Sequence, residues 1–162
     1  MICCITGHRP GGFPFERNEN NELYLEYIDK LSSEVKKLIE KGYDYFISGM
    51  AYGADIDFVK ILFDIKRENK NVFIEAALPC HIEAPKKRSC ISEERYGMIE
   101  KSDRIVAVSE KYYNGCMQKR NKYMVDKSDM VLAVWNGSIK GGTWNTVKYA
   151  RSKGKNITYI MI

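Results

Sequence analysis

The sequence predicts an α/β fold, a doubly wound and mainly parallel sheet of about six strands with helices on both faces. Short apolar segments that resemble strands alternate strictly with amphipathic segments that resemble helices. The segments 72–78, 104–108 and 130–135 are apolar almost throughout, as strands are when both faces of their sheet are covered. Right-handed crossovers between such strands produce an open, doubly wound sheet.

The same patterns predict each element in order. We expect strands at 2–6, 43–48, 72–78, 104–108, 130–135 and 156–162, and helices at about 21–41, 55–68, 92–101, 117–127 and 143–153. The first helix has the clearest pattern, because its apolar residues recur at intervals of three and four and Gly42 suits its C-terminal cap. With 162 residues and no linker, repeat or low-complexity segment, we expect one domain over 1–162.

The composition is typical of a soluble globular protein, with 44% hydrophobic and 29% charged residues. No apolar run approaches the length of a membrane span, so no membrane is expected as a partner. The first apolar run is too short for a signal-peptide core and has no basic residues before it, so we expect a cytoplasmic protein.

The five cysteines have no regular spacing, and a disulfide framework is not expected. Cys3 and Cys4 lie in an apolar segment and are expected to be core thiols. A metal site from Cys80, His81 and Cys90 is conceivable, but the pair spacing typical of zinc ligands is missing, so we expect no metal.

The formal net charge of +5 permits a polyanionic partner without requiring one. The compact basic clusters are 86–88 and 119–122, and a solvated surface is the simplest interpretation of each. A track of interleaved aromatic and basic residues, typical of proteins that bind single-stranded nucleic acid, is not evident.

The stretch 48–55 reads Ser-Gly-Met-Ala-Tyr-Gly-Ala-Asp and lies between an expected strand and an expected helix. Its glycines let the backbone turn sharply, and the helix N-terminus behind them offers free N–H groups and a positive dipole end. This combination binds phosphate or another anion. The alternative is an ordinary tight turn in which Asp55 caps the helix.

Ligands of doubly wound sheets bind beyond the carboxyl ends of the strands. Three of the five loops expected at that edge are rich in glycine and hydroxyl residues, and two of them lead into helix N-termini, so we expect a nucleotide-like ligand there. The candidate ligand-binding residues from these loops are Thr6, Gly7, His8, Arg9, Ser48, Gly49, Met50, Ala51, Gly53, Asp55, Pro79, Asn136, Gly141, Gly142 and Thr143.

Individual roles follow from side-chain chemistry. Arg9 could pair with a phosphate, and His8 could donate a hydrogen bond or act as a general acid, although each could also be an ordinary loop residue. The base or ribose is expected to meet Pro79, Tyr112 or Trp135. The glycine spacing matches neither G-x-x-x-x-G-K-[ST] nor G-x-G-x-x-G, so no standard motif assigns the ligand.

Four motifs carry a resemblance to a known family, and they span nearly the whole chain in the right order. They are Ile5-Thr6-Gly7-His8-Arg9-Pro10, the stretch 48–55, the run 120–129 and Lys140-Gly141-Gly142-Thr143-Trp144-Asn145-Thr146-Val147. The chain resembles the SLOG superfamily, which includes the SMF/DprA and LOG proteins, and within it the YpsA-like branch. The resemblance implies a Rossmann-like fold, a nucleotide-derived ligand held by the loops after strands 1, 2 and 5, and a possible homodimer.

The LOG enzymes of this superfamily split a nucleoside monophosphate into base and ribose 5-phosphate, and they use an arginine and a glutamate. Arg120 matches the arginine and is the one candidate for a catalytic role, as well as a candidate ligand-binding residue. The glutamate position falls at Lys148 or Thr146, neither of which can stabilise an oxocarbenium ion. Asp126 and Asp129 could compensate, but capping roles are the simpler interpretation.

Three hypotheses therefore compete. The first is a binding or sensor protein for a nucleotide or nucleotide-derived small molecule, with no certain cofactor. The second is a LOG-like phosphoribohydrolase with altered catalytic residues. The third is single-stranded DNA binding, as in DprA, for which nucleic acid would be the partner.

Overall fold

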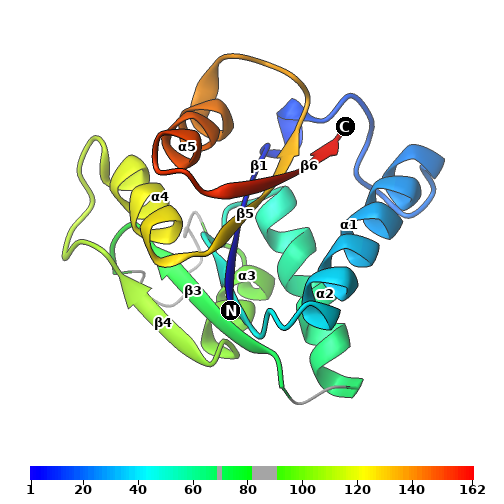
Figure 1. Cartoon of the computed structure of the whole chain (residues 1–162), viewed down its shortest axis with the longest axis horizontal. Coiled ribbons are helices and arrows are strands. Elements are labelled where there is room, and N and C mark those ends of the chain that lie inside the picture. Colours follow the sequence, from blue (N-terminus) through cyan, green and yellow to red (C-terminus); the bar gives the residue numbers. More distant parts are fainter. Residues whose placement is uncertain (69–70, 82–90) are drawn as a thin grey trace.

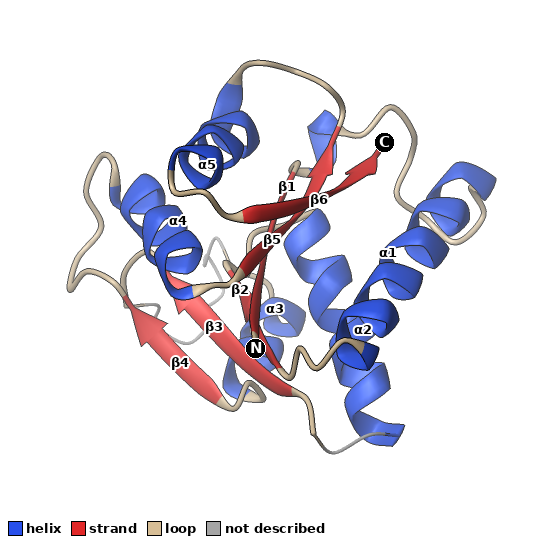
Figure 2. Ribbon diagram, in the orientation of Figure 1, coloured by secondary structure: helices blue, strands red, loops and turns tan. Residues whose placement is uncertain are grey.

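The chain forms one six-stranded sheet in which every strand pair is parallel (Figures 1 and 2). A computed structural model describes residues 1–68, 71–81 and 91–162. The strands are β1 (Ile2–Gly7), β2 (Tyr45–Ser48), β3 (Phe73–Leu78), β4 (Arg104–Ala107), β5 (Met130–Trp135) and β6 (Asn156–Met161). Their order across the sheet is β4-β3-β2-β1-β5-β6, which confirms the predicted Rossmann-like, doubly wound architecture.

In the described parts of the chain, five α-helices and one short 3-10 helix connect the strands. They are η1 (Pro10–Gly12), α1 (Glu22–Glu40), α2 (Ala54–Glu68), α3 (Glu93–Glu100), α4 (Cys116–Lys127) and α5 (Gly141–Ser152). The chain moves outward from β1 to β4 and then returns to β5 beside β1. Right-handed crossovers therefore place α1, α2 and α3 on one face of the sheet and α4 and α5 on the other (Figure 1).

Two separate hydrophobic clusters confirm this division of the helices. The larger cluster joins the sheet to α1, α2 and α3 through residues such as Leu31, Phe58 and Ile99. The smaller cluster joins the opposite face to α4 and α5 through Val125 and Ala150. Neighbouring strand residues point to opposite faces, so Cys3 belongs to the first cluster and Cys4 to the second, both as buried free thiols as predicted.

Element positions agree with the sequence prediction, and most ends fall within two residues of it. One expectation about burial was wrong. The segment 104–108 was expected to be covered on both faces, but β4 is an edge strand and Ile105 is 49% exposed. An apolar edge strand and an apolar central strand have the same sequence pattern, because strand order is decided by tertiary contacts.

A buried carboxylate fastens α4 to the sheet. Glu75 of β3 is fully buried and accepts hydrogen bonds from Tyr45 of β2 at 2.5 Å and from Tyr123 of α4 at 2.8 Å. Lys127 of α4 donates to the same carboxylate at 2.5 Å. The network therefore fixes the C-terminal half of α4, whose N-terminal half carries Arg120.

A second buried carboxylate anchors the segment that follows η1. Asp57 of α2 accepts hydrogen bonds from Arg17 at 2.6 Å and from the hydroxyls of Tyr24 and Tyr27 at 3.2 Å each. Arg17 also donates to the carbonyl oxygen of Gly53 at 3.3 Å. These hydrogen bonds connect the turn before α2, and the start of α2 itself, to α1 and to the segment that precedes α1.

Candidate anion-binding site at the strand ends

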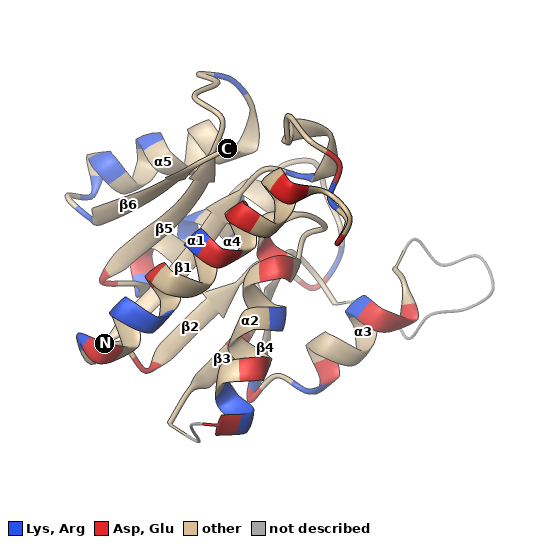
Figure 3. Ribbon diagram, turned by 90° about the vertical axis from the view of Figure 1, so that its right-hand side faces the viewer, with Lys and Arg blue, Asp and Glu red and all other residues tan. Residues whose placement is uncertain are grey.

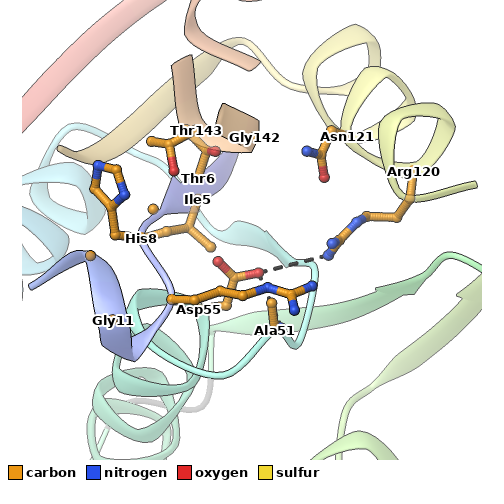
Figure 4. A pocket seen from close by; sticks show the side chains of 13 residues that line it. Ile5, Thr6, His8, Gly11, Ala51, Asp55, Arg120, Asn121, Gly142 and Thr143 are labelled. Atoms are coloured by element: carbon orange, nitrogen blue, oxygen red, sulfur yellow. Dashed lines mark hydrogen bonds and ion pairs between the residues drawn. The ribbon is translucent and has the colours of Figure 1, made fainter. Parts of the chain in front are cut away.

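A cavity of about 290 Å³ opens at the carboxyl edge of the sheet, beside β1, where the strand order reverses (Figure 4). It is formed by the loops after β1 and β2, the first turn of α5 and the middle of α4. The lining residues are Ile5, Thr6, Gly7, His8, Arg9, Gly11, Gly12, Ala51, Asp55, Arg120, Asn121, Gly142 and Thr143.

Nine of the sixteen candidate residues line this cavity, and they come from each of the loops expected to converge. Ser48, Gly49, Met50 and Gly53 lie in the β2–α2 turn without lining the cavity. Pro79, Asn136 and Gly141 do not line it either. Ile5, Gly11, Gly12 and Asn121 line the cavity but were not among the candidates. Asn121 could have been found from the sequence, because it follows Arg120 directly in the run 120–129 that carries the family resemblance.

The turn between β2 and α2 is tightly constrained. The backbone N–H of Met50 donates to Ser48 Oγ at 3.1 Å, and that hydroxyl donates to the carbonyl of Asp55 at 3.3 Å. Met50 is buried and has a φ of 53°, which is uncommon for a residue with a side chain. A Cβ on Gly53 would lie 2.2 Å from the carbonyl oxygen of His8, so only glycine permits this close approach. Strain of this kind concentrates at binding sites.

Asp55 is not the N-cap that one interpretation of the sequence expected, because α2 begins one residue earlier, at Ala54. Its carboxylate accepts a hydrogen bond from the backbone N–H of Ala51 at 3.3 Å and lies 3.7 Å from Nη1 of Arg120. Burial raises the pKa of Asp55, and the charge of Arg120 opposes that rise. Asp55 therefore orders the turn and orients the arginine.

Arg120 is the central group of the site. Its residue is only 5% exposed, which corrects the expectation that the basic cluster 119–122 is simply solvated. Burial lowers the pKa of Arg120, Asp55 opposes this, and the nearby positive charges of Arg95 and Arg9 lower it further. An arginine nonetheless stays protonated in proteins, so a positive charge is buried here.

The guanidinium of Arg120 is incompletely satisfied. Within the described parts of the chain, its Nε and Nη1 have no hydrogen-bond partner, and Nη2 has only a weak contact with Met117 Sδ at 3.9 Å. The backbone of Gly49 makes room for it, because a Cβ at Gly49 would lie 1.2 Å from Nη1. Unpaired donors on a buried charge are costly, so the arrangement suits an anion that would accept from them.

The loop after β1 is packed directly against the start of α2. Ala54 donates its backbone N–H to the carbonyl of His8 at 3.2 Å, and a Cβ at Gly7 would lie 2.3 Å from the Cβ of Ala54. Asn136 braces this loop from β5's side by donating to the carbonyl of Gly12 at 2.9 Å. Burial lowers the pKa of His8, so its imidazole is neutral near pH 7.

The first turn of α5 supplies the opposite wall. Its N-cap residue, Lys140, makes no capping hydrogen bond, and Gly141 adopts a φ of 85°. Thr143 is buried and, with Gly142, brings the positive end of the helix dipole to the cavity (Figure 4). A helix N-terminus and a buried arginine with free donors thus face the same space, which is the arrangement that binds phosphate.

The residues expected to meet a base or ribose do not line the cavity. Trp135 stacks on Trp144 with ring centroids 5.5 Å apart, and its indole N–H donates to the carbonyl of Ser138 at 2.8 Å. Tyr112 is 70% exposed to solvent. A second hollow of about 540 Å³ instead adjoins the cavity, between α4 and α5, and shares Asn121 and Gly142 with it.

The residues considered for the role of the LOG glutamate, Thr146, Lys148, Asp126 and Asp129, do not line the cavity. Thr146 is buried and donates to the carbonyl of Gly142 at 2.9 Å, while Lys148 is exposed beside Trp144. Asp126 accepts from the hydroxyl of Tyr149, and Asp129 accepts from the backbone N–H of Ile2, at the far end of β1. Among the residues that the structure describes, Asp55 is the one carboxylate that lines the cavity.

The described residues form neither a metal-binding cluster nor a membrane-spanning helix. Residues 1–68, 71–81 and 91–162 contain no group of three histidine, cysteine or acidic side chains arranged to hold a metal ion. Cys90 of the conceivable metal site and the basic cluster 86–88 lie outside the described residues. None of the described helices combines the length and apolar character needed to cross a bilayer.

A family model described as the YspA SLOG family matches residues 3–162. Among solved structures, DNA processing protein A from Helicobacter pylori has a similar fold, with a TM-score of 0.67 at 18% identity. The match covers 98% of this chain but 64% of that one, so this chain spans less than two thirds of that chain's length. The structure of that protein was described for its single-stranded DNA binding mode. No curated protein sequence matches the chain.

Proposed function

The chain belongs to the YspA SLOG family, and on that premise we propose that it binds a nucleotide or nucleotide-derived small molecule through a phosphate group held at Arg120. The observation that carries this proposal is the buried guanidinium beside the cavity, whose Nε and Nη1 make no hydrogen bond within the described residues. A phosphate has several acceptor oxygens and would satisfy these donors with charge-assisted hydrogen bonds.

The surroundings of Arg120 favour the same ligand class. The positive charges of Arg9 and Arg95 act on Arg120, so the lining carboxylate of Asp55 is outnumbered by cations among the described side chains. The hydroxyls of Thr6 and Thr143 are available as donors at the cavity wall. An anionic group bound here would relieve the repulsion among the arginines, and this repulsion would otherwise work against folding.

The proposal is tested by measuring binding of AMP, CMP, ribose 5-phosphate and inorganic phosphate, by thermal shift and by calorimetry. We expect the phosphate esters to stabilise the protein. We expect Arg120→Met to weaken their binding about tenfold or more, since hydrogen bonds to charged groups contribute about 1.5–3 kcal/mol. The matched control is Lys119→Met, which removes a positive charge from the exposed neighbour of Arg120 and should leave affinity within about twofold. Equal losses in both variants, or no stabilisation by any ligand at millimolar concentration, would contradict the proposal.

The same cavity argues against LOG-type hydrolysis as the primary activity. The oxocarbenium ion formed in N-glycosidic cleavage requires a free carboxylate close to the sugar, as in glycoside hydrolysis. The carboxylate of Asp55 is already committed to Arg120 and to the backbone of Ala51. We therefore expect no release of free base from AMP or CMP, which chromatography of the incubated nucleotides would check.

Single-stranded DNA binding is the second candidate, and the distribution of charge favours it. Helix α4 carries four basic residues and one acidic residue, and α5 carries two basic residues and no acidic one. Figure 3 shows the basic positions along α5. Lys148 and Arg151 lie over the ring of Trp144, at 5.9 and 5.5 Å from its centroid. A labelled oligothymidylate should bind at low salt and dissociate steeply as salt rises, with weaker binding in Arg151→Ala. Undetectable binding at low salt would eliminate this function.

A further inference from the structure

The proposed phosphate site does not use the hollow between α4 and α5, which is called here the α4–α5 groove. Its volume is about 540 Å³, and it is lined by both helices and by the glycines that begin α5. The cavity beside Arg120 has a volume of about 290 Å³, which lies at the lower end of the volumes typical of small-molecule sites, about 300–1,000 Å³. The cavity alone suits a phosphorylated sugar, and a larger ligand would have to extend beyond it.

The groove is the natural extension of the cavity, because Asn121 and Gly142 line both. Figure 4 shows Asn121 on the α4 side of the cavity, across from Gly142 on α5. Gly142 leaves the passage open, since a Cβ built on it would meet no heavy atom within 4 Å. A ligand can therefore pass over Gly142 from one hollow to the other.

The chemistry of the groove matches a nucleobase. Its lining residues include three that carry carboxamide side chains, Gln118, Asn121 and Asn145, together with Met117 and Tyr149. A carboxamide presents a donor and an acceptor side by side, which is the pattern that reads the edge of a base. Met117 and Tyr149 offer apolar contact to the flat face of the ring.

One of these carboxamides is held in place from inside the protein. Asn121 Nδ2 donates to Thr146 Oγ1 at 2.9 Å, and Thr146 in turn donates to the carbonyl of Gly142 at 2.9 Å. Within the described residues, the Oδ1 of Asn121 accepts no hydrogen bond. A fixed acceptor with a free oxygen at the junction of the two hollows can receive a ribose hydroxyl or a base amino group.

We propose that the α4–α5 groove is the nucleoside subsite of this protein, and that its ligand is a 5′-phosphorylated nucleoside. The phosphate lies at Arg120, the ribose passes over Gly142 and the base lies between α4 and α5. This inference rests on the proposed phosphate site. It also moves the base away from Pro79, Tyr112 and Trp135, none of which lines either hollow.

The test fills the groove while the phosphate cavity stays intact. Asn145 is exposed on α5 and lines the groove but not the cavity, so Asn145→Trp should fold and occupy the base position. AMP and ribose 5-phosphate are the two probes, measured by calorimetry on the full chain. We expect wild type to bind AMP at least about tenfold more tightly than ribose 5-phosphate, as stacked bases commonly provide. Asn145→Trp should remove that advantage and leave ribose 5-phosphate affinity within about twofold.

The matched control is Lys148→Trp, which places the same side chain at an exposed position of α5 outside the groove. It should leave the affinity for AMP unchanged. The inference is overturned if Asn145→Trp binds AMP as wild type does, or if wild type binds AMP and ribose 5-phosphate equally well. If neither probe binds, the proposed phosphate site itself fails and the nucleoside subsite fails with it. That outcome is distinct from retained AMP binding in Asn145→Trp.

Discussion

The two faces of the sheet differ in how they are held together. Counted over the described residues, the face covered by α1, α2 and α3 has an apolar cluster of 24 buried residues, whereas the face covered by α4 and α5 has 7. The second face compensates with polar contacts, such as those of Glu75 with Tyr123 and Lys127, and it adjoins both hollows. The difference teaches that one face holds most of the apolar core, while the more thinly packed face contributes Arg120, Asn121 and the start of α5 to the candidate site.

Charge divides in the same way. Helix α3 has three acidic residues and one basic residue, while α4 has four basic residues and one acidic residue. Among the described helices, the positive charge is therefore concentrated on α4 and α5, where an anionic ligand or polyanion would be attracted. The formal charge of +5 says nothing about this asymmetry.

The largest expected effect is in the apolar core of the first face. Phe58 is fully buried and packs edge-to-face on Phe46 at 5.9 Å, so Phe58→Ala should cost about 3–5 kcal/mol of unfolding free energy. Met124→Ala in the smaller cluster should cost about 2 kcal/mol, because fewer neighbours surround its cavity. Urea denaturation compares the two variants. If Met124→Ala lost more unfolding free energy than Phe58→Ala, the larger cluster would not be the main source of stability.

The next largest effect is expected at Glu75, whose hydrogen bonds attach α4 to the sheet. Burial alone would raise the pKa of Glu75, but hydrogen bonds from Lys127, Tyr45 and Tyr123 outweigh it and lower the pKa. A lowered pKa stabilises the fold above the unfolded value, about 4.3, and this stabilisation is lost as pH falls through the folded value. Glu75→Gln should therefore cost about 2 kcal/mol at pH 7 and reduce the loss of stability between about pH 5 and pH 3.

Exposed Glu26 provides the control for that pH experiment, since it makes only a surface ion pair at 3.9 Å. Glu26→Gln should keep the pH profile of wild type. An identical acid profile in Glu75→Gln and wild type would show that the Glu75 network does not contribute to the stability of the second face.

A substitution at Gly49, in the turn that contacts Arg120, should affect stability less but should clearly weaken binding. Gly49→Ala introduces a methyl where Nη1 of Arg120 lies, so the flexible guanidinium should shift away from the cavity. Affinity for phosphate esters should fall about tenfold, corresponding to about 1.4 kcal/mol. Gly97→Ala on α3 is the control, because its Cβ meets nothing within 4 Å and an alanine favours the helix. Unchanged affinity in Gly49→Ala would mean that Arg120 does not set the binding.

The smallest effect is expected on the exposed surface of the first face. Lys37 pairs with Glu34 at 2.7 Å, one helical turn away on α1. Lys37→Ala should change the unfolding free energy by less than about 0.5 kcal/mol, because exposed pairs are screened by solvent. Thermal denaturation measures this change. A loss of unfolding free energy above about 1 kcal/mol would show that a surface ion pair contributes substantially to the stability of this face.

Much of the candidate site could be predicted from sequence because it consists of backbone. The loops after β1 and β2 and the first turn of α5 were identified from their glycines, and residues from all three line the cavity. Side chains that act through long-range packing could not be placed in this way. The carboxylate of Glu75 and its partners on β2 and α4 meet only in the folded sheet.

The sequence by itself determined the order of strands and helices, the parallel sheet and the loops that line the candidate cavity, because these follow from local periodicity and from the residues that turns require. Only the tertiary structure decided that β4 is an edge strand, that Arg120 is buried with free donors, and that a groove separates α4 from α5. The physical reason is that burial and the meeting of distant groups depend on strand order and helix packing. A basic residue in a polar helical segment has the same sequence signature whether it faces solvent or a cavity.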